Sequence, residues 1–522
     1  MSPQVPSNSP APEAAEVSIP GAAQDARQPP SFDTVLGHPK PLWMLFMSEF
    51  WERFAFYGMR WALTLYIVAQ FFAGDASGEG YAGRTYGAFL ALVYATAIFG
   101  GYVADRVIGY QRSILVGAVV MAAGLFMITL PSQPLFLLGL AVVIVGNGLF
   151  KPNISSMVGQ LYAEGDDRRD RGFTLFYMGI NGGALIAPIL TGWLASQVFG
   201  TPMEQNFRSV FVAAGVGMLI SLVWFWFGRR QLKGIGEPPP DRAPGKSLLA
   251  VIVGTVVAIP IVYVLMAQVG AIGLAWLLGV LFVGVVVVLV GGGMKTDRVG
   301  LHRVLAMLIL FLFNVLFWMF FEQAGSSFNF LAQNIVDRDL FGPGGFVFPT
   351  GWFQSVNPVA IVVLAPIVTL VWAFTSKRGI EPSIPRKFGI GLLGNALGFS
   401  VLMYALSSLV DPQAGTIPFW PLVLCYVLQT AGELCLSPIG LSMVTKLAPL
   451  RMVGMAMGGW FLSIAIGNNL SGILAGSISG ETGMTVESAL AGFTFSFWLL
   501  VGAGVVLLLI APLVNRLMHG VK

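Results

Sequence analysis

The chain has 522 residues, of which 56% are apolar and only 10% are charged, and its formal net charge is +4. Soluble proteins carry about 25% charged residues, so this composition argues against a secreted protein, a soluble enzyme and a nucleic-acid-binding protein. Roughly 290 apolar residues would supply about 12 to 14 membrane-spanning helices of about 20 residues each. The sequence therefore predicts an all-α polytopic membrane protein embedded in a lipid bilayer.

The N-terminal residues 1–41 are rich in Pro, Ser and Ala, and we expect them to form a disordered cytoplasmic tail. No apolar segment typical of a cleavable signal precedes the first predicted span. The two cysteines, Cys425 and Cys435, and the three widely spaced histidines predict neither a disulfide framework nor a zinc site. We therefore expect no metal and no cofactor.

Apolar runs separated by charged residues or by Gly and Pro clusters divide the rest of the chain into fourteen predicted spans. They are 42–72, 84–105, 112–131, 134–162, 171–198, 207–228, 247–267, 270–292, 302–334, 351–376, 388–410, 417–447, 450–477 and 488–515. With the N-terminus placed in the cytoplasm, most Lys and Arg residues fall on the cytoplasmic side, and Arg84, Arg208 and Arg338 fall outside. Because cytoplasmic loops accumulate positive charge, this pattern places both termini in the cytoplasm.

The spans are arranged as six, two and six. We expect an N-terminal six-helix bundle at 42–229, a linker with an inserted helix pair at 230–299, and a C-terminal six-helix bundle at 300–522. The inserted pair carries no charged residue between 247 and 292, so we expect it to be a scaffold or to face lipid. The loop GYVADRVIGYQR at 101–112 resembles the G-x-x-x-D-R-x-x-G-x-[RK] loop of the major facilitator superfamily, which implies that fold; the alternative is an ordinary charged turn.

Four charged residues lie inside the first span: Glu49, Glu52, Arg53 and Arg60. At 100° per residue these side chains and Tyr57 fall within one stripe about 140° wide. A charge at the centre of a membrane helix costs about 2.5–3.5 kcal/mol on insertion scales, so the stripe should face the bundle interior. Two hypotheses follow: a structural ion-pair network that joins helices, or a water-accessible pathway, which the number of charges favours.

Three more ionisable residues interrupt later spans: Lys151, Glu322 and Glu433. Four acids then stand against three bases, so one acid lacks a basic partner and is free to gain and lose a proton. The three bases precede residue 230, whereas Glu322 and Glu433 follow residue 300. If both halves line one cavity, its walls differ in sign and suit a zwitterion with a carboxylate at one end and an ammonium at the other.

The segment EFWERFAFYGMR at 49–60 resembles the E-x-x-E-R-F-x-[YF]-Y signature of proton-dependent oligopeptide transporters. Further segments that resemble this family follow in the expected order: GLFKPN at 148–153, FTLFYMGIN at 173–181, FEQ at 321–323, FQSVNP at 353–358 and GELCLSPIG at 432–440. The resemblance covers nearly the whole core, and the inserted pair resembles the two extra helices of bacterial members. It implies proton-driven symport of di- and tripeptides by alternating access across the cell inner membrane, and we expect a monomer.

The resemblance also implies a role for individual residues. Arg53 and Lys151 would hold the peptide carboxylate, and Glu433 would hold the peptide amine. Neutral groups near the two charged ends of the peptide would be Tyr57, Tyr94, Asn181, Asn357 and Ser437. Trp318 and Trp460 would be aromatic residues of the pocket or gate.

For proton coupling, the resemblance implies a network of Glu49, Glu52 and Arg53, with Glu322 as the protonatable acid of the seventh core span. Glu322 would pair with Arg60 when the outer side is closed. Lys151 and Glu433 would form the corresponding pair on the inner side.

The sequence departs from the family pattern at two places. Phe56 stands where many members have tyrosine, and Gly183 and Ala184 stand where a serine is expected. Both departures concern selectivity. The same fold could instead carry nitrate, a drug or a single amino acid. A membrane enzyme is disfavoured because no H-E-x-x-H or G-x-S-x-G element is present, and a channel is disfavoured because facing charges of opposite sign trap ions.

Overall fold

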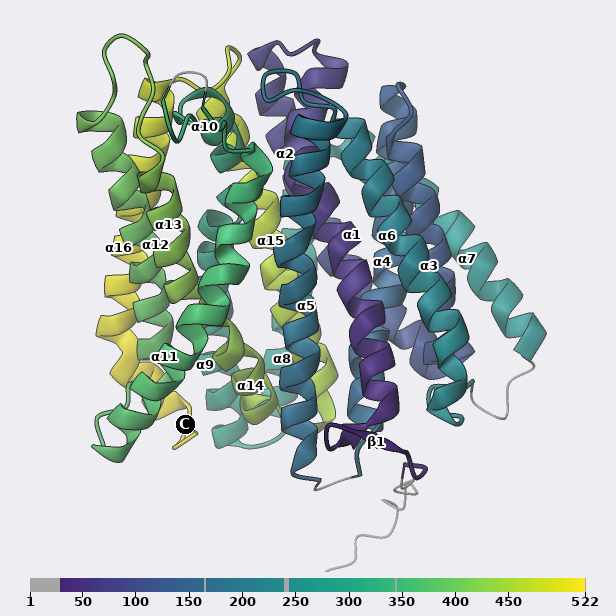
Figure 1. The fold of residues 1–522 in the computed structure, drawn as a ribbon. Helices are drawn as coiled ribbons and strands as arrows, with labels where there is room; N and C mark the ends of the chain where they lie inside the picture. Colours follow the sequence, from purple (N-terminus) through teal and green to yellow (C-terminus); the bar gives the residue numbers. More distant parts are fainter. Residues whose placement is uncertain (1–28, 164–165, 239–243, 343–344, 522) are drawn as a thin grey trace, which may run out of the picture.

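The computed structural model describes residues 29–163, 166–238, 244–342 and 345–521, and it is mainly helical (Figure 1). The predicted all-α architecture is confirmed. The first six long helices are α1 (Lys40–Phe71), α2 (Glu79–Val103), α3 (Tyr110–Ile128), α4 (Gln133–Gln160), α5 (Arg168–Trp193) and α6 (Phe207–Gly228). Short 3-10 or π turns adjoin them at Ala76–Gly78, Ala104–Ile108, Leu194–Val198 and Arg229–Leu232. We refer to residues 40–232 as the N-terminal half.

The remaining helices form an intervening pair and a second group. The pair is α7 (Pro244–Val264) and α8 (Gly270–Met294), joined by a π turn at Leu265–Val269. The second group is α9 (Arg298–Phe321), η6 (Glu322–Gly325), α10 (Ser327–Asn334), η7 (Thr350–Ser355), α11 (Val356–Lys377), α12 (Ile384–Ser408), α13 (Trp420–Leu434), α14 (Ser437–Leu447), η8 (Leu450–Met452), α15 (Val453–Ser479) and α16 (Val486–Leu517). We refer to residues 298–517 as the C-terminal half.

Twelve helical segments of the described residues are long and apolar enough to cross a membrane. Each of the fourteen predicted spans overlaps a helix. The number of predicted spans, fourteen, exceeds the twelve segments of the structure for two reasons. Helix α1 is not among the twelve, because its charged stripe lowers its hydropathy. The predicted spans 247–267 and 270–292 lie in one continuous helical segment, Gly245–Met294, which is 50 residues long.

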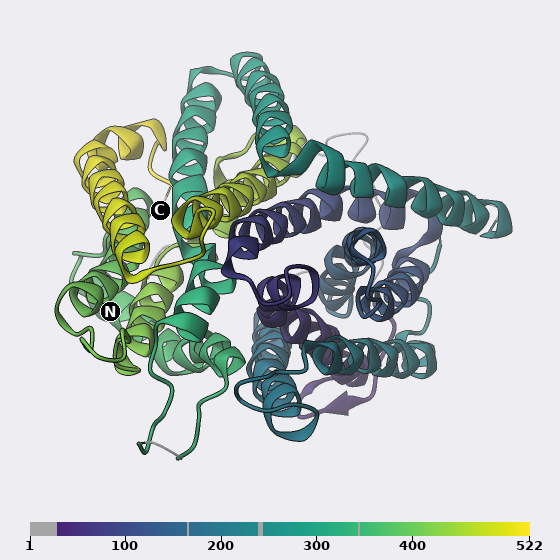
Figure 2. The same cartoon turned by 90° about the horizontal axis from the view of Figure 1, so that it is seen from above.

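The two halves lie side by side, as Figure 2 shows from above, and the pair α7–α8 runs along one edge of both. Helix α7 packs against α4 of the N-terminal half, whereas α8 packs against α2 and against α9 and α15 of the C-terminal half. Most of the pair is exposed, as expected for helices that face lipid. Gly270, at the junction, has φ +64°, a conformation that favours glycine.

Two predicted spans are broken in the structure, and each break lies at an acidic residue. Helix α9 ends at Phe321 and a 3-10 turn begins at Glu322. Helix α13 ends one residue after Glu433, and α14 begins at Ser437 with Pro438 in its first turn. Pro438 has no amide N–H and therefore fits the first turn of a helix, where that N–H would have no partner within the helix. Non-helical backbone within a membrane must be buried or line a cavity, so both breaks mark the bundle interior.

The N-terminal tail predicted for 1–41 differs from the structure in its last residues. Residues 1–28 lie outside the described part of the chain. Strands β1 (Thr34–Val35) and β2 (His38–Pro39) form an antiparallel hairpin, and α1 already begins at Lys40. The hairpin is held by a 2.9 Å hydrogen bond between His38 Nδ1 and Tyr162 Oη, which follows α4. It lies at the same end of the bundle as the C-terminal residues, which we call the termini end; the opposite end carries α10 (Figure 1).

The two halves meet closely along α2 and α15. A Cβ atom added at Gly87 would lie 2.6 Å from the Cα atom of Gly472, and one added at Gly83 would lie 3.1 Å from the Ala475 Cβ atom. Such distances leave room only for glycine at Gly87. The seam between the halves is therefore built from backbone packed on backbone.

Candidate functional site

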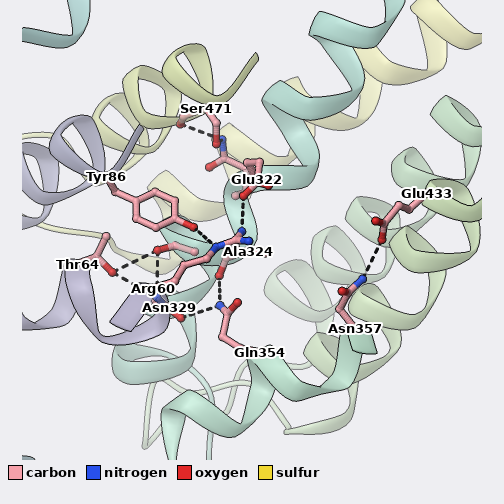
Figure 3. A network of polar contacts seen from close by, with 12 residues as sticks. Arg60, Thr64, Tyr86, Glu322, Ala324, Asn329, Gln354, Asn357, Glu433 and Ser471 are labelled. Carbon is pink, nitrogen blue, oxygen red and sulfur yellow. Dashed lines mark hydrogen bonds and ion pairs between the residues drawn. The ribbon is translucent and has the colours of Figure 1, made fainter. Parts of the chain in front are cut away.

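Arg60 and Glu322 form an ion pair between the two halves (Figure 3). Arg60 Nη2 donates to Glu322 Oε2, and Arg60 Nε donates to Tyr86 Oη at 2.6 Å. The two charged side chains are 12% and 4% exposed, so the pair is nearly removed from solvent. Glu322 reaches Arg60 because the break after α9 turns it towards α1. The structure thus brings together two predicted residues that are far apart in the sequence.

Neutral hydrogen bonds extend this contact towards the α10 end. Asn329 Nδ2 donates to the backbone carbonyl oxygen of Trp61 at 2.8 Å, and Thr64 Oγ1 donates to the Gly325 carbonyl oxygen at 3.3 Å. Gln354 Nε2 donates to Asn329 Oδ1 at 3.1 Å, as Figure 3 shows. The segment between Glu322 and α10 is therefore joined to α1 by several bonds besides the ion pair.

The acidic and basic residues of α1 form a buried cluster. Arg53 Nε lies 3.2 Å from Glu49 Oε1, and Arg53 Nη2 donates to Glu52 Oε1 at 2.6 Å. Asn147 of α4 donates to the same Glu52 oxygen at 3.0 Å. All four residues are at most 2% exposed. This part of the predicted one-sided stripe is present as a network of ion pairs, with Asn147 as an additional partner.

Lys151 lies in α4 and carries a charge without a counter-ion. Its Nζ atom lies 4.8 Å from the ring centre of Tyr94, so it makes a cation–π contact with a predicted neighbour. Within the described part of the chain, no carboxylate oxygen lies within 4.0 Å of Lys151. Its side chain is half-buried.

Glu433, on α13 of the C-terminal half, is the corresponding acid. Its Oε2 atom accepts a 3.0 Å hydrogen bond from Asn357 Nδ2, which also donates to Thr430 Oγ1 at 2.9 Å (Figure 3). No basic group among the described residues lies within 4.0 Å of Glu433. The Oγ atom of Ser437, one turn further, is buried and has no hydrogen-bond partner. Among the four acids singled out inside the predicted spans, Glu433 is therefore the one without an ion-pair partner.

The other predicted site residues make local contacts. Asn181 Nδ2 donates to the Tyr177 carbonyl oxygen at 2.9 Å, and Tyr57 lies under the Arg60 guanidinium, whose Cζ atom is 5.7 Å from the ring centre. Trp318 Nε1 donates to Asn314 Oδ1 at 3.0 Å. Trp460 is 2% exposed and packs edge-on against Phe311 and Phe388. The pocket role of the two tryptophans stays a prediction.

The arrangement divides the membrane charges into two groups. Glu49 and Glu52 share Arg53 within the N-terminal half, so that cluster has a formal charge of −1 when both acids are ionised, and Arg60 and Glu322 neutralise each other across the halves. Of the seven charged residues singled out inside the predicted spans, the two without an ion-pair partner are the cation Lys151 on the N-terminal half and the anion Glu433 on the C-terminal half. A molecule with a carboxylate and an ammonium matches these two charges in sign. No cluster of three or more His, Cys, Asp or Glu side chains that could hold a metal occurs in the described ranges.

Two direct hydrogen-bond partners of the charged side chains were not found from the sequence. Tyr86 accepts a hydrogen bond from Arg60, and Asn147 donates one to Glu52. Asn147 lies four residues before Lys151, one helical turn away on the same face, and this spacing was a usable signal. Tyr86 had no such signal, because its contact depends on how α1 and α2 pack.

Comparisons with known proteins agree over nearly the whole chain. The model of the POT family matches residues 111–490. A peptide transporter of Yersinia enterocolitica, YePEPT, is 37% identical and covers 96% of this chain and 99% of its own. Dipeptide and tripeptide permease B of Xenorhabdus bovienii is 34% identical and covers 92% and 96%. The crystal structure of a POT family transporter in complex with 5-aminolevulinic acid is similar with a TM-score of 0.78 and 31% identity, covering 94% and 99%.

Proposed function

The chain belongs to the POT family of transporters, and from this premise we propose that it imports di- and tripeptides together with protons by alternating access. It is a multi-pass membrane transport protein and not an enzyme. Relatives named peptide transporter and dipeptide and tripeptide permease support the substrate class. We place the protein in the cell inner membrane, as a monomer that needs no cofactor and is driven by the proton gradient.

We further propose that the chain crosses the membrane fourteen times, as two six-helix bundles with an inserted helix pair. Both termini then lie in the cytoplasm, because the basic loops lie at the termini end. The α10 end is extracellular. With Arg60 paired to Glu322 at that end, and with Lys151 and Glu433 unpaired, the described conformation is closed to the outside.

The observation that carries the proposed binding mode is the pair of unmatched charges on opposite halves. The carboxylate of the peptide binds to Lys151 and Arg53, and its amine binds to Glu433. The proposed neutral contacts are Tyr57, Tyr94, Asn181, Asn357 and Ser437. The hydrogen bond from Asn357 supports this mode because it holds the Glu433 carboxylate in position. A substrate with both charges pairs with Lys151 and with Glu433, whereas a substrate with one charge leaves one of these two residues without a partner.

Proton coupling in this proposal depends on Glu322. When Glu322 is ionised, its pair with Arg60 holds the outer side closed; protonation removes the charge and lets that side open. The peptide then competes for Lys151 and Glu433, which pair with each other when the inner side is closed. Glu49, Glu52 and Arg53 form the adjoining proton network. Coupling follows because protons and peptide compete for one set of charged partners.

Purified protein in proteoliposomes tests the function. Under an inward proton gradient, we expect uptake of labelled dialanine that collapses when the gradient is dissipated. Free alanine and nitrate should not compete. 5-Aminolevulinic acid is included as a competitor, because it carries an amine and a carboxylate and is bound by a structural neighbour. Nitrate uptake without dialanine uptake, or dialanine uptake that ignores the gradient, would contradict the proposal.

A further inference from the structure

Basic side chains surround a cavity where α6 ends, at the termini end of the bundle (Figure 1). The cavity has a volume of about 520 Å³. Its polar lining comes from the start of α3 and from the segment after α6: Gln111, Arg112, Arg229, Arg230, Lys233 and Glu237. Four bases therefore face one acid among the described lining residues, and none of the roles above uses them.

The walls of this cavity are fixed by hydrogen bonds. The backbone N–H of Gln111 donates to the Gly236 carbonyl oxygen at 3.0 Å, and Gln111 Nε2 donates to the Ile235 carbonyl oxygen at 2.7 Å. These bonds hold the segment after α6 against the start of α3. Lys233 Nζ donates to the Ser31 carbonyl oxygen at 2.6 Å, which uses one of the three N–H groups of its ammonium. An anion that enters the cavity thus meets a preformed wall.

Three of the four bases have no counter-ion in the described part of the chain. No carboxylate oxygen there lies within 4.0 Å of Arg229, Arg230 or Lys233. Arg229 stacks on Trp226 instead, with its Cζ atom 3.8 Å from the ring centre. Arg230 and Lys233 are exposed. Bases that gather around one cavity without acids attract a ligand of negative charge.

An apolar groove of about 600 Å³ lies on the surface of the same helix. Most of its lining comes from one face of α6: Val216, Leu219, Ile220, Val223, Trp224 and Phe227. Met44 of α1 contributes to the opposite wall. Because most of these α6 side chains are exposed, they face the acyl chains of the bilayer.

The groove and the cavity follow each other along α6. Phe227 lines the groove, and Arg230, three residues later, lines the cavity. Three residues are about one helical turn, so these two side chains lie on the same face. Tryptophan gathers at the membrane–water boundary, and the exposed Trp224 and Trp226 place that boundary between the groove and the bases. A molecule with apolar chains and an anionic head matches this order.

We propose that the groove and the cavity form one binding site for an anionic phospholipid. The phosphate of the headgroup binds to Arg230 and Lys233, and an acyl chain lies in the groove. Basic pockets at the membrane surface bind such headgroups. A soluble anion would use the cavity but would have no use for the groove. The bound lipid attaches the start of α3 and the segment after α6 to the bilayer.

The test titrates purified, delipidated protein with dioleoyl phosphatidylglycerol and counts bound lipid by native mass spectrometry. Dioleoyl phosphatidylcholine has the same chains and no net charge, and it should bind at least tenfold more weakly. Arg230→Gln with Lys233→Gln should weaken the binding of phosphatidylglycerol about 25-fold, because each base near a lipid surface contributes about fivefold. The matched control is Lys377→Gln with Arg378→Gln, which removes two exposed bases at the end of α11 and should change the affinity less than twofold.

Two further arms separate a lipid from a soluble anion. Val223→Trp fills the groove without changing any charge and should weaken the binding of phosphatidylglycerol, whereas Val362→Trp, at an exposed position of α11, should not. Inorganic phosphate should displace phosphatidylglycerol no better than sodium chloride of the same ionic strength. Displacement by phosphate alone would assign the cavity to a soluble anion and overturn the proposal.

A second readout separates lost binding from a damaged fold. Phosphatidylglycerol should raise the melting temperature of the native protein and of the Lys377→Gln, Arg378→Gln control, each relative to its own lipid-free value. The Arg230→Gln, Lys233→Gln variant should lose this rise. Equal binding of the two lipids, or equal losses in the two double variants, would refute the site. Neither readout needs dialanine, so a failure of peptide uptake would contradict the proposed function and leave the lipid site standing.

Discussion

Replacing Glu322 by Gln removes the charge that holds Arg60 and keeps the shape of the side chain. Two unit charges 4 Å apart attract by about 4 kcal/mol at an effective dielectric constant of about 20, and the pair is only 12% and 4% exposed. The amide oxygen of Gln can still accept a hydrogen bond from Arg60, and this bond replaces about 1.5–3 kcal/mol of the lost attraction. The net loss is about 1–2.5 kcal/mol, or about a 5- to 70-fold shift away from outer closure.

The assay compares two kinds of dialanine uptake in the same proteoliposomes. Uptake driven by a proton gradient should fall at least tenfold in Glu322→Gln, because residue 322 can no longer exchange a proton. Counterflow, which needs binding and exchange but no net proton movement, should stay within about threefold, since Lys151 and Glu433 are untouched.

Glu487→Gln, which changes an exposed acid in the first turn of α16, serves as a control for the loss of one negative charge and should retain both activities. Undiminished driven uptake in Glu322→Gln would refute the role of Glu322 in coupling. Equal loss of driven uptake and counterflow would show that Glu322 serves binding or folding instead. In the double variant Arg60→Gln with Glu322→Gln, the fraction of outer-closed molecules should be smaller than in the native protein but larger than in Glu322→Gln alone. The double variant leaves no buried arginine unpaired.

Three further predictions follow from the structure. Glu433→Gln should weaken the binding of dialanine about 10- to 100-fold, as expected for the loss of a charge-assisted bond worth about 1.5–3 kcal/mol, and should leave the binding of N-acetylated dialanine unchanged in a competition assay. Gly87→Ala should disfavour the outer-closed state by about 1–3 kcal/mol through overpacking, because its Cβ atom would lie 2.6 Å from Gly472 Cα. Spin-label distances across the outer ends should lengthen. Unchanged distances would contradict the close packing of α2 on α15 in the outer-closed state. Burial, together with nearby arginines, lowers the pKa of His38 below its ordinary value of 6.5. The docked hairpin therefore holds His38 neutral, and its docking should weaken as the pH falls below about 6.5, since the undocked form then binds more protons. Lower protection of the hairpin amides at 34–38 from hydrogen exchange at pH 5.5 than at pH 7.5, corrected for the intrinsic pH dependence of amide exchange, would report this, and the His38→Phe variant should lose the difference.

Much of the fold and part of the site could be predicted from the sequence. The fourteen apolar runs overlap helices because burial in lipid requires uninterrupted backbone hydrogen bonding. The stripe of Glu49, Arg53 and Arg60 followed from helical periodicity alone. The pairing of Arg60 with Glu322 required the resemblance to a family, because nothing in the local sequence links positions so far apart.

The features that were missed depend on tertiary packing. The interruptions after Phe321 and Leu434 lie inside long runs that are apolar on average, so hydropathy predicts each run as one span although Glu322 and Pro438 stand at the breaks. Glu79 lies before the predicted span 84–105, and nothing in the local sequence indicates that it is buried. It accepts hydrogen bonds from Asn334 and Met484, whose approach is decided by the packing of the two halves.

The exposed pair α7–α8 touches both halves, since α7 packs against α4 while α8 packs against α2, α9 and α15. Any rocking of one half against the other must therefore be transmitted to this pair and absorbed near Gly270 at their junction. The surrounding lipids must then rearrange around this exposed apolar helix pair in every transport cycle, so the properties of the bilayer affect the energy of the conformational change. Membrane thickness and fluidity should accordingly influence turnover more strongly here than in a transporter that lacks such an appendage.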